Sequence, residues 1–155
     1  MMESEYRVLI EHVSPRPIAA VKTRMQIDRV SAQFVQYLNQ VYDASRNGSI
    51  SLDGQNIFVY RGTDPRDVEI DFGVGATKPF SPIGAVTYTY TPGGKVATTT
   101  HWGDYGALGL AHDAVVSWCR ANGHQLAGPR WEVYGHWVAD APRQRTDIYH
   151  LLIGD

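Results

Sequence analysis

The sequence has 155 residues, of which 43% are hydrophobic and 19% charged, and its formal net charge is −2. This length predicts one domain with its own hydrophobic core, and the composition excludes an intrinsically disordered chain. It carries no basic stripe of the kind that binds duplexes, and no run approaches the roughly 20 apolar residues of a spanning helix. We therefore expect a cytoplasmic protein that binds neither nucleic acid nor membrane directly. The single cysteine excludes a disulfide within the chain.

The first half of the chain predicts two strands, a helix and two further strands. Residues 6–10 and 18–25 are β-forming runs, and the prolines between them force the chain to bend or restart. We expect Asp28 to cap a helix, because apolar residues recur after it at helical spacing. These residues are Val30, Phe34, Tyr37, Leu38 and Val41. Strands follow at 56–61 and 68–74, and alternation of apolar and acidic residues in the latter predicts one solvated face.

The second half repeats this order. Two β-forming runs, 85–91 and 95–102, flank a Pro-Gly-Gly turn, which predicts a hairpin. We expect Asp104 to cap a second helix with one apolar face. That face carries Leu108, Ala111, Val115, Trp118 and Cys119. The last two strands are expected at 130–137 and 146–153.

An internal repeat relates the two halves. Residues 56–62 align with 130–136 at a shift of 74, and the predicted helix starts differ by a similar 76 positions. The identities are Val59 with Val133 and Tyr60 with Tyr134. The matching order of elements indicates duplication, and the alternative is a chance similarity between short β-forming runs.

Duplication predicts an α+β fold built from two strand-helix-strand-strand units. We expect a single domain over 1–155, with pseudo-repeats at about 1–78 and 79–155, forming one antiparallel sheet with both helices on one face. The opposite face would then be concave and partly open. The seam between the halves is a natural place for a ligand.

The strand around Glu132 is the most informative segment for chemistry. Side chains alternate across a strand, so Glu132 and Tyr134 share one face, and the repeat places Phe58 and Tyr60 at the equivalent positions. A buried glutamate needs a tyrosine hydroxyl, an amine or water nearby, or its pKa rises. Such a carboxylate could hold a flat cation or act as a general acid or base. The alternative is a solvated glutamate on an edge strand.

A second candidate segment surrounds Trp102. This residue ends a predicted strand and could form a pocket lip, although core packing explains a tryptophan there equally well. The six histidines are scattered without metal-ligand spacing, so we predict no metal site. No phosphate-cradling or dinucleotide-binding glycine motif is apparent, so we predict no cofactor.

Several segments resemble the GyrI-like domain, also called the AraC-type or bacterial transcription activator effector-binding domain. The similar segments are 15–21 (PRPIAAV), 101–108 (HWGDYGAL) and 131–134 (WEVY), followed by Asp140, Pro142 and 146–149 (TDIY). The resemblance covers nearly the whole chain in the right order. It implies a stand-alone member, because the first strand leaves no room for a preceding DNA-binding helix-turn-helix.

The resemblance implies three functions. The first is binding of hydrophobic compounds, cationic ones among them, by Glu132, Tyr134, Phe58, Tyr60, Trp102 and Tyr149. The second is hydrolysis of reactive cyclopropane-bearing compounds, in which Glu132 activates water or protonates the leaving atom and Tyr134 or Tyr149 hydrogen-bonds the substrate carbonyl. The third is inhibition of a large enzyme such as gyrase through a protein interface. On physical grounds Glu132 supports binding and catalysis about equally, and the oligomeric state is left open.

Overall fold

The computed structural model describes residues 6–154, which form eight strands, two α-helices and three short 3-10 helices. The strands are β1 (Leu9–Val13), β2 (Pro17–Met25), β3 (Leu52–Arg61), β4 (Val68–Ala76), β5 (Val86–Tyr90), β6 (Gly94–Trp102), β7 (Leu126–Tyr134) and β8 (Arg145–Leu152). The helices are α1 (Val30–Ser45) and α2 (Leu108–Ala121), with 3-10 turns η1 (Ile27–Arg29), η2 (Tyr105–Ala107) and η3 (Ala141–Arg143). Within the described range, no helix is both long and apolar enough to cross a membrane.

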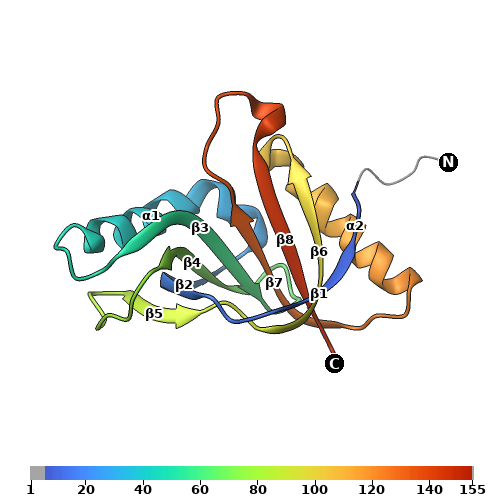
Figure 1. Cartoon of the computed structure of the whole chain (residues 1–155), viewed down its shortest axis with the longest axis horizontal. Coiled ribbons are helices and arrows are strands. Elements are labelled where there is room, and N and C mark those ends of the chain that lie inside the picture. The colour runs from blue at the N-terminus through green and yellow to red at the C-terminus, as the bar shows by residue number, and fades with distance from the viewer. Residues whose placement is uncertain (1–5, 155) are drawn as a thin grey trace.

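All eight strands form one antiparallel sheet in the order β1-β6-β8-β7-β3-β4-β2-β5 (Figure 1). The order β2-α1-β3-β4 recurs as β6-α2-β7-β8, and the two units meet where β3 pairs with β7. Phe58 lies directly opposite Glu132 in that pair, so these two equivalent positions of the repeat face each other across the seam. The expected α+β fold of duplicated units, with both helices on one face, is confirmed.

The outermost strands are exchanged between the two units. Strand β1 precedes β2 in the chain but pairs with β6, and β5 precedes β6 but pairs with β2. The predicted hairpin across residues 92–94 is therefore wrong, because β5 and β6 lie near opposite ends of the strand order and do not pair with each other. The β1–β2 and β5–β6 connections contact each other. The backbone N–H of Thr91 donates to the Arg16 carbonyl, and a Cβ on Gly93 would lie 2.5 Å from Pro15.

Each α-helix is preceded by a 3-10 turn, and this changes how the helices begin. Asp28 lies inside η1, and Asp104 precedes η2, but neither start has a side-chain capping hydrogen bond. The two predicted aspartate caps are therefore wrong. The Asp104 backbone carbonyl instead takes part, accepting bonds from the Ala107 N–H and from His101 Nε2 at 2.8 Å.

The sheet is packed on both faces. Helix α1 covers the first unit with a core around Phe72, and α2 covers the second with a core around Ile148. The opposite face, expected to be open, carries a third apolar cluster that includes Trp131 and Ile57. Strand β4 therefore lacks the predicted solvated face. Its Asp71 is 1% exposed and receives a 2.7 Å bond from Arg61.

Candidate functional site

A large cavity lies on the helix-bearing face, over the β3–β7 seam and between α1 and α2. Its volume is about 960 Å³, at the upper end of the range typical of small-molecule sites. Strands β3 and β7 form the floor with Phe58, Tyr60, Glu132 and Tyr134. The cavity thus forms at the predicted seam but on the opposite side of the sheet from the one expected, because the other side is filled by the third apolar cluster.

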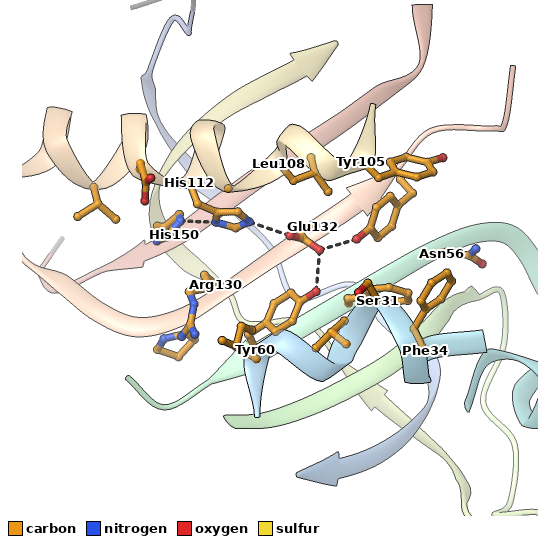
Figure 2. Close-up of a pocket in the computed structure, with 18 of the residues that line it drawn as sticks. Ser31, Phe34, Asn56, Tyr60, Tyr105, Leu108, His112, Arg130, Glu132 and His150 are labelled. Atoms are coloured by element: carbon orange, nitrogen blue, oxygen red, sulfur yellow. Dashed lines mark hydrogen bonds and ion pairs between the residues drawn. The ribbon is translucent and has the colours of Figure 1, made fainter. Parts of the chain in front are cut away.

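Glu132 is the charged centre of this cavity, with 5% of its surface exposed. One carboxylate oxygen, Oε1, accepts hydrogen bonds from the hydroxyls of Tyr60 at 2.8 Å and Tyr134 at 2.5 Å. The other oxygen, Oε2, lies 2.7 Å from Nε2 of His112 (Figure 2). Both oxygens are therefore held by strong donors, which is the condition under which a buried carboxylate is tolerated.

His112 extends the network to a second histidine. Its Nδ1 lies 2.9 Å from Nε2 of His150, and the two rings are tilted edge to face at 68°. His112 comes from α2 and His150 from β8, so the helix is tied through the pair to the strand beneath it. Over residues 6–154, no group of three or more His, Cys, Asp or Glu side chains could hold a metal ion.

The electrostatics of the site follow from burial and these bonds. Burial opposes ionisation of Glu132, but the hydrogen bond and the charge of His112, together with the bonds from Tyr134 and Tyr60, hold its pKa below the usual value. Burial, followed by the charge of Glu132, raises the pKa of both tyrosines well above the usual value. Burial, with the charges of His112 and Arg130, lowers the pKa of His150 to about 3. At neutral pH the site therefore holds a glutamate anion, two neutral tyrosines and a neutral His150.

Aromatic rings build the walls around this charge. Phe58 packs edge-on against Tyr134 with centroids 4.9 Å apart, and Phe34 from α1 lies 5.7 Å from Phe58. Tyr105 from η2 meets Tyr134 at 90° and 5.4 Å. The guanidinium of Arg130 lies 5.9 Å from the centroid of the Tyr60 ring. The cavity therefore offers π-faces and apolar edges around one buried anion.

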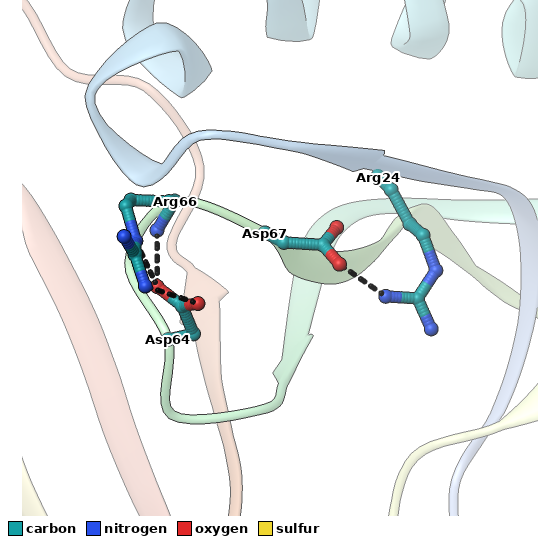
Figure 3. Close-up of polar contacts among 4 residues, drawn as sticks. All are labelled: Arg24, Asp64, Arg66 and Asp67. Carbon is teal, nitrogen blue, oxygen red and sulfur yellow. Dashed lines mark hydrogen bonds and ion pairs between the residues drawn. The ribbon is translucent and has the colours of Figure 1, made fainter.

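The β3–β4 turn sets one end of the cavity. Thr63 from the turn and Ile27 from η1 both line it, and the Ile27 N–H donates to the Pro65 carbonyl at 2.8 Å, which fastens η1 to the turn. Two exposed ion pairs stiffen the same region, Asp64 with Arg66 and Asp67 with Arg24 (Figure 3). Such exposed pairs contribute little stability individually, so the backbone bond is the main link.

Four of the six predicted ligand-binding residues gather in the cavity: Glu132, Tyr134, Phe58 and Tyr60. The other two lie on the opposite face of the sheet. Tyr149 is paired with Trp131 in the β7–β8 ladder and stacks on its ring at 5.3 Å, whereas Trp102 is 58% exposed beside Arg145. Neither residue lines the cavity that contains Glu132, so the structure does not bring these two together with the other four.

Sequence reasoning missed the two histidines of the network. A signal was present for each. His112 follows Leu108 by four residues and precedes Val115 by three, which places it at the edge of the apolar helix face. His150 lies two residues from each of the buried Ile148 and Leu152 along β8, so all three side chains share the inward face of the strand.

No family model matches the sequence, and no curated protein shows a significant sequence match to it. Solved structures do match. The EcmrR C-terminal domain has a TM-score of 0.79 at 16% identity, covering 97% of this chain and 99% of that one. SAV2435, solved bound to tetraphenylphosphonium, has a TM-score of 0.68 at 10% identity, covering 96% and 94%. The chain has a GyrI-like fold.

A hydrolase from Listeria innocua also matches, with a TM-score of 0.55 at 12% identity, covering 94% of this chain and 91% of that one. All three identities are low, so these matches establish the shared fold. Structures with this fold are thus described as the EcmrR C-terminal domain, a protein bound to tetraphenylphosphonium and a hydrolase. Function must therefore be argued from the residues of the cavity.

Proposed function

We propose that this protein binds hydrophobic aromatic compounds that carry a positive charge, with the charge placed beside Glu132. The observation that carries the proposal is an ionised carboxylate, 5% exposed, in the floor of an aromatic cavity of about 960 Å³. A buried anion attracts a cation far more strongly than an exposed one, because water screens it less. The rings of Phe58, Tyr60 and Tyr134 add cation–π attraction and apolar contact.

The hydrogen bonds of Glu132 narrow the type of cation. Three donors already bind the carboxylate, from Tyr60, Tyr134 and His112. A ligand therefore does not need to donate a hydrogen bond of its own. Quaternary or delocalised cations, which have no N–H to offer, suit such a site. SAV2435, which shares the fold, is described as bound to one such cation, tetraphenylphosphonium.

The test is a titration with rhodamine 6G and with methyltriphenylphosphonium, followed by fluorescence and calorimetry. The wild-type protein should bind both, and Glu132→Gln should bind them about 10–100-fold more weakly, the loss expected for one buried charge contact. Glu11→Gln, which changes an exposed glutamate on the edge strand β1, is the matched control and should bind like the wild type. Equal, negligible binding by wild type and Glu132→Gln would refute the proposal.

Hydrolysis is the second candidate, and the network favours it by one feature. Glu132 is ionised and can therefore accept a proton from water, although its lowered pKa makes it a weak base, and His112 and His150 lie in line behind it. Of the two alternatives expected for a buried glutamate, the tyrosine partners are present and the pKa is lowered, so the role of proton donor is disfavoured. Incubation with an electrophilic cyclopropane compound should then give a product heavier by one water, and no product above background would exclude it.

The protein-interaction alternative has no comparable support. The two acids considered for it are engaged within the fold: Asp71 is buried against Arg61, and Glu69 lies 3.8 Å from Lys22.

A further inference from the structure

The His112–His150 pair can hold a proton without breaking any hydrogen bond. Because Glu132 is an anion, Nε2 of His112 must donate to it. With both rings neutral, Nε2 of His150 donates to Nδ1 of His112. With a proton on Nδ1 of His112, the same contact reverses and His150 accepts, changing only its tautomer. The 2.9 Å contact therefore serves both charge states.

The pair holds at most one positive charge. His150 is 4% exposed and lies close to Arg130, and its pKa of about 3 keeps it neutral above acid pH. Glu132 does not take the proton either, because its pKa is held below the usual value. A proton that enters this network therefore resides on the His112 ring, because neither His150 nor Glu132 accepts it.

Several other charged or titratable groups lie around His112. From the surrounding segments these are Glu132, Arg130 and Tyr134 on β7, His136 after β7, His150 on β8, Tyr60 on β3, Tyr105 on η2, Asp28 on η1, and Asp113 and Arg120 on its own helix. Of this set, Glu132 and His150 are hydrogen-bonded to the His112 ring itself.

We propose that a cation binding beside Glu132 displaces the proton from His112, so that the affinity of this site for cations depends on pH. The inference rests on the proposed binding function and adds its regulation. With His112 charged, the carboxylate is already neutralised and the ligand meets a like charge. With His112 neutral, the full charge of Glu132 is available to the ligand.

Linkage and electrostatics give the size of the effect. If binding of one cation displaces one proton, the affinity changes by up to about tenfold per pH unit. Two like charges about 6 Å apart, at an effective dielectric constant of about 20, weaken binding roughly 100-fold. Cation affinity should therefore rise roughly 100-fold between acid and mildly alkaline pH and then level off. A neutral ligand of the same shape should show little change.

The experiment compares methyltriphenylphosphonium with the neutral triphenylphosphine oxide, by calorimetry from pH 5.5 to 8.5. Each titration is repeated in two buffers with different ionisation enthalpies, which counts the protons released. Wild type should release close to one proton per cation at low pH and none at high pH, with no release for the oxide. His112→Gln, whose amide still donates to Glu132, should bind the cation with no pH slope and no release. His12→Gln on the exposed edge strand β1 is the control.

The outcomes separate the two proposals. No binding of the cation at any pH would refute the binding function itself. Tight cation binding with a flat pH profile, or the same slope for the oxide, would overturn the proton displacement alone. A slope that persists in His112→Gln would also overturn it. If His112→Gln fails to fold, the comparison of the two ligands on the wild-type protein still decides the question.

Discussion

Removing the hydroxyl of Tyr60 tests whether the hydrogen bonds to Glu132 stabilise the fold. Tyr60 is 6% exposed, and its O–H donates to Oε1 of Glu132 at 2.8 Å. Tyr60→Phe removes this one donor and leaves the ring in place. Glu132 then keeps only Tyr134 on Oε1 and His112 on Oε2. Because both side chains are buried, the lost bond leaves part of a buried charge without a donor, which is costly.

A hydrogen bond to a charged group is worth about 1.5–3 kcal/mol, against about 0.5–1.5 for a neutral one. We expect Tyr60→Phe to lower the free energy of unfolding by about 1.5–3 kcal/mol at pH 7. For a chain of this size that corresponds to roughly 3–12 °C in Tm. In a Glu132→Gln background, where the acceptor is neutral, the same substitution should cost only about 0.5–1.5 kcal/mol.

The pH dependence of the free energy of unfolding follows from the lowered pKa of Glu132. A carboxyl whose pKa is lower in the folded state contributes stability above its unfolded value, near 4.3, and loses it as pH falls through the folded value. Wild type should therefore lose stability in acid more steeply than Glu132→Gln.

Urea unfolding at pH 7 gives all four corners of the Tyr60 and Glu132 double-mutant cycle. Tyr37→Phe is the matched control, because its ring stacks on Phe72 and its hydroxyl makes no hydrogen bond with any described residue. The control should change stability by less than about 0.5 kcal/mol. A similarly small effect of Tyr60→Phe, or an equal effect in both backgrounds, would refute the reasoning.

Two further predictions test the geometry. Phe34→Ala, which removes a wall of the cavity, should weaken binding of methyltriphenylphosphonium about 5–50-fold by calorimetry, whereas Trp102→Ala on the other face should leave it within about twofold; equal losses would contradict the placement of the site. Gly93→Ala should destabilise the fold by about 1–3 kcal/mol in urea unfolding, because its Cβ would lie 2.5 Å from Pro15; an unchanged midpoint would show that the two connections can separate freely.

The parts of the fold that rest on local patterns could be predicted from the sequence. The spacing of Val30, Phe34 and Val41 predicts α1, and alternation along β7 places Glu132 and Tyr134 on one face. The choice of pairing partner for a strand does not depend on local sequence. A β-forming run such as 86–90 can pair with any free edge, and nothing in its residues selects β2 over β6.

The position of Tyr149 depends on strand pairing in the same way. Alternation within β8 does not fix its register against β7, and a slip of one residue exchanges the two faces. The observed register puts Ile148, not Tyr149, beside Glu132. The contact between His112 and Glu132 depends on this same register and on how α2 is rotated over the sheet. Periodicity could place His112 on the inner side of the helix, but it could not name its partner.

The exchange of β1 and β5 delays the pairing of β1 during synthesis of the chain. Leu9 of β1 pairs with Thr98 of β6, which leaves the ribosome roughly 90 residues later, or about 5–20 s at ordinary rates of synthesis. During that interval β6, the strand with which β1 pairs, has not yet been synthesised. The apolar residues of β1, such as Ile10, would then be open to pairing with other chains. The nascent first half is therefore the stage at which the unpaired β1 is most exposed to such pairing.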